Sequence, residues 1–148
     1  SFYKEAFLFF TLEHFSYSMK ERKTKPSKIY CIDNGLRNSV SFRFSKDEGK
    51  LAENLVLVEL KRRGADAYYW TDRGEVDFIV KNKDQTLTAI NVSFTDEIEE
   101  RELKSLLEFK EKFGKTSGMT VITRNAERRE GKIRFVPLWK WLLANGEE

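Results

Sequence analysis

The segment Gly74-Glu75-Val76-Asp77-Phe78-Ile79-Val80, a polar turn over residues 81–86 and the segment Leu87-Thr88-Ala89-Ile90-Asn91-Val92-Ser93-Phe94 predict a β-hairpin. Side chains of a strand alternate between its two faces. One face is therefore expected to be apolar, with Val76, Phe78 and Val80 against Ile90, Val92 and Phe94. The other face is expected to collect Glu75, Asp77, Asn91 and Ser93.

The polar turn also predicts the register of this hairpin. Cross-strand pairs in an antiparallel ladder have a constant sum, so folding about Asp84 places Asp77 opposite Asn91 and Glu75 opposite Ser93. Two carboxylates, an amide and a hydroxyl then lie within about one cross-strand spacing of each other. This concentration of polar groups makes the hairpin the expected location of a functional site.

The hairpin lies within a longer succession of predicted elements. Hydrophobic spacing predicts a helix over residues 46–63, which ends at Gly64 because glycine readily adopts a left-handed conformation. A second helix is expected from Thr95-Asp96 onward, with a core stripe of Leu103, Leu106, Leu107 and Phe113. Strands are expected over 67–71, 118–124 and 132–136, and a short helix over 137–143. The order helix, three strands, helix, strand predicts an α/β fold with a mixed central sheet flanked by helices.

Residues 1–45 are expected to form an N-terminal extension that packs on a core of residues 46–148. The extension comprises an aromatic strand over 7–14, an exposed basic loop over 20–28 and a short strand over 28–32. A chain of 148 residues and 17.5 kDa can bury one hydrophobic core without disulfides or structural metal ions, so we expect one compact domain.

Composition restricts the class of protein. A net charge of +3 is only mildly basic and does not establish a nucleic-acid partner. The single cysteine, Cys31, excludes an internal disulfide and suits a reducing compartment, and no apolar run approaches the roughly 20 residues that span a bilayer. We therefore expect a cytoplasmic protein without a membrane partner. Because the chain begins at Ser1 within sequence that looks structured, it is expected to be a piece of a longer protein.

Several short motifs together resemble a known family. They are Lys28–Leu36, Gly49–Val56, Glu59-Leu60, Tyr69-Trp70, Gly74–Val80, Arg101–Leu103 and Pro137–Trp139. As a set they resemble the C-terminal domain of unassigned function on archaeal and bacterial AAA-type ATPases, placed in the PD-(D/E)XK nuclease superfamily. The resemblance runs from about Phe15 to the end of the chain. It implies a restriction-endonuclease-like αβββαβ core and an ATPase module upstream, although the chain itself has no phosphate-binding loop.

The resemblance also implies which residues form the site. In active members a helix glutamate, a strand aspartate and an acidic-x-lysine pair gather magnesium, and Glu53 and Asp77 match the first two. Asn91 and Ser93 stand where the acidic residue and the lysine belong, so the catalytic set is degenerate. Glu53 and Asp77 are the expected Mg²⁺ ligands if metal binding is retained, and otherwise no cofactor is expected. The alternative is that both are structural carboxylates that cap backbone or pair with Arg or Lys.

Basic residues suggest contacts to phosphates in two places. The first group is Lys20, Arg22, Lys23, Lys25 and Lys28, and the second is Arg101 and Lys104 at the start of the helix after the hairpin. Neutralising the phosphate backbone dominates nucleic-acid affinity. Runs of charge are also often merely solvated, and ion pairing with nearby acids is an equally good reading of the second group.

Three functions remain open from the sequence. The leading hypothesis is a nuclease-fold domain that binds nucleic acid, with DNA expected, for an attached ATPase and without efficient cleavage. The second is a Mg²⁺-dependent endonuclease in which the lysine function is supplied from elsewhere. The third is a protein-interaction or oligomerisation module in which the polar face is simply covered. The choice among the three depends on how the side chains of Glu53, Asp77, Asn91 and Ser93 lie relative to one another.

Overall fold

The computed structural model describes residues 8–33, 35, 48–95 and 98–144. Its strands are β1 (Phe9–Leu12), β2 (Lys28–Cys31), β3 (Asp66–Thr71), β4 (Glu75–Lys81), β5 (Leu87–Ser93), β6 (Thr116–Thr123), β7 (Arg128–Glu130) and β8 (Ile133–Pro137). Its helices are α2 (Met19–Thr24), α4 (Glu48–Arg62), α5 (Glu100–Lys112) and α6 (Leu138–Leu143). The succession α4, β3 to β5, α5 and β6 confirms the predicted αβββαβ order.

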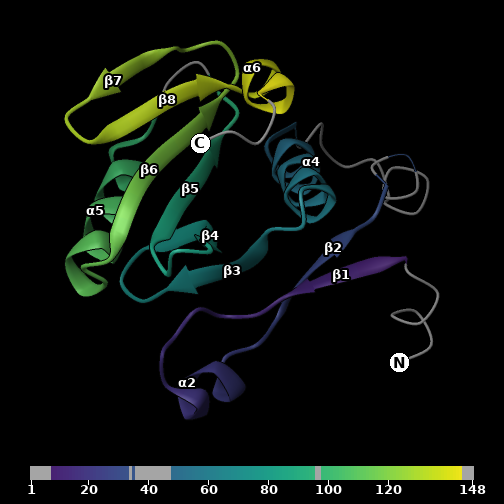
Figure 1. Cartoon of the computed structure of the whole chain (residues 1–148). Coiled ribbons are helices and arrows are strands. Elements are labelled where there is room, and N and C mark those ends of the chain that lie inside the picture. The colour runs from purple at the N-terminus through teal and green to yellow at the C-terminus, as the bar shows by residue number, and fades with distance from the viewer. Residues whose placement is uncertain (1–7, 34, 36–47, 96–97, 145–148) are drawn as a thin grey trace.

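A six-stranded mixed sheet forms the centre of the molecule, in the order β3-β4-β5-β6-β8-β7. Strands β3, β4 and β5 are antiparallel, whereas β5, β6 and β8 run parallel, and β7 pairs antiparallel with β8. Helix α5 covers one face of the sheet, and α4 and α6 cover the other (Figure 1). The expected α/β class with a mixed sheet between helices is therefore confirmed.

The apolar face predicted for the hairpin packs under α4 for all of its members except Val76, whereas the other face, which was predicted to be polar, also carries core side chains. Ile79, Leu87 and Ala89 join the cluster under α5, and Phe78 and Ile90 join the cluster under α4. A sheet with helices on both faces must bury apolar residues on both. The polar site residues therefore lie at the end of the hairpin near Glu75 and Ser93 rather than along one face.

The register predicted for the hairpin is confirmed for residues 78–81 against 87–90, and the ladder does not extend to the predicted pairs Asp77–Asn91 and Glu75–Ser93. Phe78 pairs with Ile90 and Lys81 with Leu87, so each pair sums to the value expected for a fold about Asp84. In the turn, Asp84 Oδ1 accepts hydrogen bonds from the Thr86 backbone N–H at 2.9 Å and from its hydroxyl at 2.7 Å.

A β-bulge interrupts strand β4 at the site. Tyr68 pairs with Ile79 and Trp70 with Val76, so Tyr69 alone lies opposite the two residues Asp77 and Phe78. Such a bulge shifts the alternation of side chains along the strand. Val76 consequently packs with Trp70 under α5, and Phe78 packs under α4. The predicted common face for Val76 and Phe78 is thus incorrect.

The N-terminal segment contains a helix where an exposed loop was predicted. Residues 20–28 were expected to form a basic loop, but Met19–Thr24 form α2. Ser18 caps this helix by accepting the Glu21 N–H, and the carboxylate of Glu21 accepts the Ser16 hydroxyl at 2.7 Å. A serine cap satisfies an unpaired N–H of the first turn, which offsets the charge repulsion among the lysines.

Helix α4 has the features expected from the sequence. It reaches Arg62, and Gly64 follows with φ +69°, the left-handed conformation predicted for the helix end. Asn54 of this helix is buried and bonds both backbone groups of Cys31, at 2.9 and 2.8 Å. These two bonds attach strand β2 to α4 beside Glu53.

Helix α5 begins at Glu100, later than the predicted start at Thr95-Asp96, and Asp96 lies outside the described residues. Leu106 and Phe109 are buried against the sheet, whereas Leu107 is 52% exposed. The assignment of Leu107 to the core stripe was therefore wrong.

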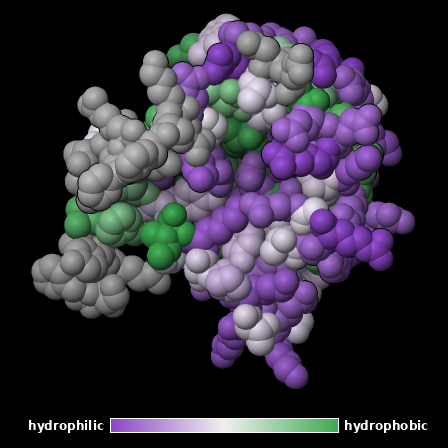
Figure 2. Space-filling model, turned by 180° about the vertical axis from the view of Figure 1, so that it is seen from behind, coloured by the Kyte–Doolittle hydropathy of each residue, from purple (hydrophilic) through white to green (hydrophobic). Residues whose placement is uncertain are grey.

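The face of the molecule seen in Figure 2 is mostly hydrophilic, in keeping with a chain that is 34% charged.

Candidate functional site

Glu53 of α4 lies at the centre of a polar pocket. Its Oε1 accepts a hydrogen bond from the Tyr30 hydroxyl at 2.5 Å and lies 3.8 Å from Lys28 Nζ. Its side chain is 23% exposed. Burial and the negative charge of Glu53 raise the pKa of Tyr30, so this phenol remains a donor. The helix acid is therefore paired with β2.

Lys28 of β2 is the cation of this pocket. Its Nζ also contacts Glu75 Oε1, and it lies 5.2 Å from the centre of the Tyr69 ring. Burial alone would lower the pKa of Lys28, but the bond to Glu75 and the charges of Glu53 and Asp77 raise it. Lys28 therefore stays charged. Sequence reasoning placed it among the nucleic-acid contacts instead.

Asp77 of β4 faces the same pocket. Its Oδ2 accepts the Val92 backbone N–H at 2.8 Å. Burial and the nearby charge of Glu53 raise the pKa of Asp77 to about 7, although the Val92 bond and Lys28 act in the opposite direction. Near neutral pH this carboxyl thus exchanges a proton.

This raised pKa predicts a pH dependence of stability. The folded chain keeps a proton on Asp77 that the unfolded chain releases around pH 3.8, so the contribution is complete below pH 3.8 and is lost as pH rises through about 7. We expect wild-type stability to fall by about 2 kcal/mol relative to Asp77→Asn between about pH 5 and pH 8. Urea unfolding of both proteins across this range measures the difference. Parallel pH curves would contradict the expectation.

Asn91 and Ser93 do not join Glu53 and Asp77 in one pocket. Asn91 is fully buried, its Oδ1 accepts the Asp77 N–H at 3.1 Å, and its Nδ2 donates to Glu102 O and Ser105 Oγ, both at 3.0 Å. Ser93 is buried, and its hydroxyl lies 3.4 Å from that of Thr95. The amide of Asn91 therefore connects the hairpin to α5, and it has no exposed surface for a ligand.

The pocket does not fit the magnesium ion implied by the nuclease resemblance. No three His, Cys, Asp or Glu side chains within residues 8–33, 35, 48–95 and 98–144 are arranged to hold a metal ion. Lys28 contacts the carboxylate of Glu75 and lies 3.8 Å from that of Glu53. The backbone N–H of Val92 donates to one oxygen of Asp77. Magnesium needs free oxygens in near-octahedral geometry. These contacts agree better with the alternative in which Glu53 and Asp77 are structural carboxylates that bond backbone or pair with a basic residue.

Several of the basic residues predicted to bind nucleic acid already have partners. Arg22 pairs with Glu13 at 3.2 Å, Arg101 with Glu99 at 2.9 Å, and Lys104 with Glu100 at 3.3 Å. Within the described part of the chain, Lys20, Lys23 and Lys25 have no ion pair with a carboxylate. Among the residues predicted to bind nucleic acid, the cations without a carboxylate partner in the described part of the chain are therefore those of α2 and its C-cap.

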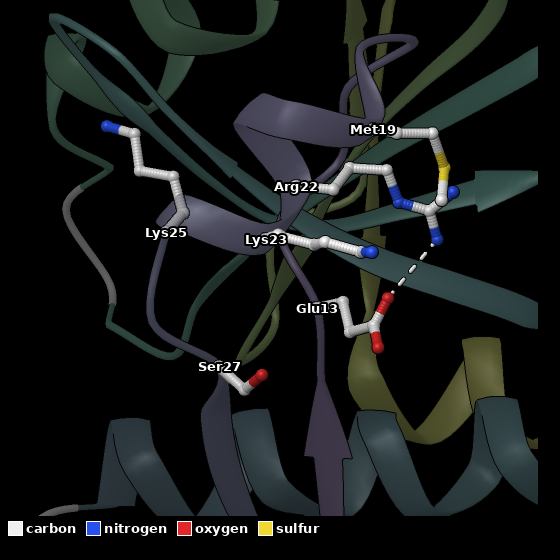
Figure 3. A pocket seen from close by; sticks show the side chains of 6 residues that line it. All are labelled: Glu13, Met19, Arg22, Lys23, Lys25 and Ser27. Carbon is white, nitrogen blue, oxygen red and sulfur yellow. Dashed lines mark hydrogen bonds and ion pairs between the residues drawn. The ribbon is translucent and has the colours of Figure 1, made fainter.

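A cavity of about 280 Å³ lies against α2. Its lining comprises Glu13, Met19, Arg22, Lys23, Lys25 and Ser27. In Figure 3 the side chains of Arg22 and Lys23 extend to the same side of the helix, where Arg22 meets Glu13, and Lys25 extends to the other. Arg22 and Lys23 give the Glu13 side of this cavity more positive than negative charge, which makes it a candidate anion site.

Tyr30, Lys28 and Glu102 are the participants that sequence reasoning missed or misassigned. Lys28 and Tyr30 are two residues apart on β2, so their side chains lie on the same face of the strand. Both contact Glu53, which is 25 positions from Lys28 in the chain. Burial raises the pKa of Glu102, near the Asn91 amide. The spacing of two residues predicts a common face for Lys28 and Tyr30, but it does not predict which element β2 packs against.

The fold and the site define a mixed α/β domain with a lysine-centred carboxylate pocket. Residues 48–141 match the family DUF4143, a domain of unknown function, and the chain belongs to that family. It is 33% identical over 96% of its length to an uncharacterized protein of Methanocaldococcus jannaschii, and 30% identical over 95% to an uncharacterized protein of Haemophilus influenzae. The chain spans about a third of each relative. No solved structure matches it significantly.

A membrane span is not evident among the described residues, since none of their helices is both long and apolar enough to cross a bilayer.

Proposed function

We propose that this chain is a restriction-endonuclease-like domain that binds nucleic acid, with DNA as the expected ligand, and has lost efficient hydrolysis. The observation that carries the proposal is the position of the basic cavity on α2. The cavity extends to Ser27, and the next residue, Lys28, reaches the pocket of Glu53. A cationic surface thus adjoins the position where the resembling superfamily has its catalytic acids.

Charge favours α2 as the phosphate-binding surface. Lys23 and Lys25 are exposed and have no carboxylate partner in the described part of the chain. The pair of Arg22 with Glu13 is itself partly exposed, and exposed pairs are worth only about 0–1 kcal/mol, so a phosphate can compete for the guanidinium. Each neutralised phosphate releases counterions and contributes affinity that depends on salt.

Weak or lost hydrolysis is supported by the chemistry of the site. Strand β5 contributes the neutral side chains Asn91 and Ser93 where the resemblance requires a carboxylate and a lysine. Without those charges, neither the metal nor the developing phosphorane charge is stabilised from this strand.

We further propose that the domain serves an ATPase module in its parent protein. The support is the resemblance carried by the sequence motifs, together with the greater length of the two relatives, of which the aligned segment is 34%. On this proposal the predicted extension, of which residues 8–33 and 35 are described, packs on the nuclease-like core.

DNA binding is tested with a matched pair of double variants. We expect Lys23→Ala with Lys25→Ala to weaken binding of a labelled duplex about tenfold or more and to reduce the salt slope by about 2, since each lysine neutralises one phosphate. Fluorescence anisotropy between about 50 and 200 mM salt measures both quantities.

The control removes the same charge from another part of the surface. Lys83 and Lys115 lie at the turn end of the hairpin, and Lys83→Ala with Lys115→Ala should change affinity less than about twofold. Equal losses in both variants would show non-specific attraction. No binding at low salt would refute the proposal, and self-association without phosphate affinity would favour the interaction module.

The alternative function is a Mg²⁺-dependent endonuclease, and the observation that supports it is the shared pocket of Glu53 and Asp77. Incubation of plasmid DNA with the domain and magnesium distinguishes the candidates. Cleavage that disappears in Asp77→Ala would establish the nuclease, and its absence would favour a binding domain.

A further inference from the structure

The carboxylates of Glu53, Glu75 and Asp77 surround a single ammonium group. Lys28 Nζ contacts Glu75 Oε1, lies 3.8 Å from Glu53 Oε1 and interacts electrostatically with Asp77. We propose that Lys28 is the built-in cation of this pocket, which holds the carboxylates together and excludes a divalent metal ion. This inference rests on the proposed function and deepens it, because it assigns the loss of hydrolysis to an occupied metal position.

Lys28 is held in place more firmly than a typical surface lysine. Its side chain is only 25% exposed, and its ammonium lies over the face of Tyr69. Strand β2 is attached to α4 by the two bonds between Asn54 and Cys31. The ammonium is therefore confined next to Glu53, and the entropy lost in forming the ion pair is small.

One oxygen of each carboxylate in the pocket already has a partner. Oε1 of Glu53 accepts the Tyr30 hydroxyl and faces the lysine, and Oδ2 of Asp77 accepts the Val92 N–H. Magnesium would need such oxygens at about 2.0–2.1 Å and would repel the ammonium at this distance. The metal and the charged lysine therefore compete for the same space.

The charge of the pocket also suits one monovalent cation. The ammonium of Lys28 contacts Glu75 Oε1 and lies 3.8 Å from Glu53 Oε1, so one cation faces both carboxylates. A partly buried pocket with a small residual charge costs less than one with three unpaired carboxylates. Removal of the ammonium leaves an anionic pocket that attracts a divalent ion.

The test is gain of metal binding in Lys28→Met, with Mn²⁺ as the probe. Electron paramagnetic resonance of free Mn²⁺ counts the bound ions at pH 8. We expect the variant to bind one Mn²⁺ about tenfold or more tightly than wild type, because carboxylate oxygens are hard ligands. Adding Asp77→Asn to the variant should abolish the gain.

Lys112→Met is the matched control. Lys112 pairs with Asp72 at 2.8 Å and lies 5.6 Å from the Trp70 ring, so it shares the carboxylate and aromatic contacts but has no carboxylate cluster. This variant should bind Mn²⁺ no better than wild type. Equal gain in both variants would overturn the inference.

Wild-type protein provides a test that does not depend on the variant. Wild-type binding of Mn²⁺ that is lost in Asp77→Asn would overturn the inference. A Lys28→Met chain that folds only with Mn²⁺ would support it, and one that stays unfolded with Mn²⁺ would contradict it, since the ion should replace the ammonium. Failure of DNA binding would refute the proposed function without affecting these metal measurements.

Discussion

Replacing Asn91 with leucine is expected to lower the free energy of unfolding by about 2–4 kcal/mol, because it leaves buried polar groups unpaired. The Asn91 side chain accepts the Asp77 N–H and donates to Glu102 O and Ser105 Oγ, and Asn91 has no exposed surface. The Asp77 N–H loses this acceptor, and a leucine of similar size supplies no replacement. Urea unfolding at neutral pH measures the loss.

The same substitution at Asn82 is the control. Asn82 Nδ2 donates to the hydroxyls of Thr86 and Thr88 at 2.9 and 3.1 Å, but this residue is half-buried at the hairpin turn. Water can replace its lost partners, so we expect a cost of about 1 kcal/mol or less. Equal costs at the two positions would show that Asn91 does not have the structural role assigned to it.

Replacing Phe109 with alanine is expected to cost about 3–5 kcal/mol, since it removes a large side chain from the centre of the core. Phe109 is fully buried under the sheet. Its ring centre lies 4.7 Å from that of Phe113, 5.4 Å from Trp70 and 5.9 Å from Phe15. The loss combines transfer free energy, a residual cavity and broken edge-to-face contacts. Thermal and urea unfolding both report it.

Leu107 on the same helix provides the comparison. It is 52% exposed, so Leu107→Ala should change stability by no more than about 0.5 kcal/mol. A large loss at Leu107 with a small one at Phe109 would mean that α5 presents the opposite face to the sheet. That outcome would also remove Ser105 from contact with Asn91.

Part of the site could be predicted because it depends on local pattern. Alternation and the polar turn predicted a register in which Asp77 comes opposite Asn91, and the observed pairs of the hairpin follow this register. The alternative in which Glu53 pairs with Arg or Lys agrees with its contact to Lys28, and Tyr30 also donates to it. Local periodicity is sufficient for such inferences.

The rest of the site depends on events that leave little trace in a single sequence. The bulge opposite Tyr69 changes which residues of β4 point toward α4. No residue type in that stretch predicts a bulge. The amide of Asn91 could equally have faced a ligand, and only the packing of α5 directs it to Ser105.

The sequence by itself determined the order of elements from α4 to β6, the hairpin and the left-handed end of α4 at Gly64. Each of these depends on residues that are neighbours in the chain. Only the tertiary structure decided that Lys28 fills the carboxylate pocket and that Asn91 belongs to the core. Contacts between residues distant in the chain depend on how whole elements pack, and periodicity within one element does not contain that information.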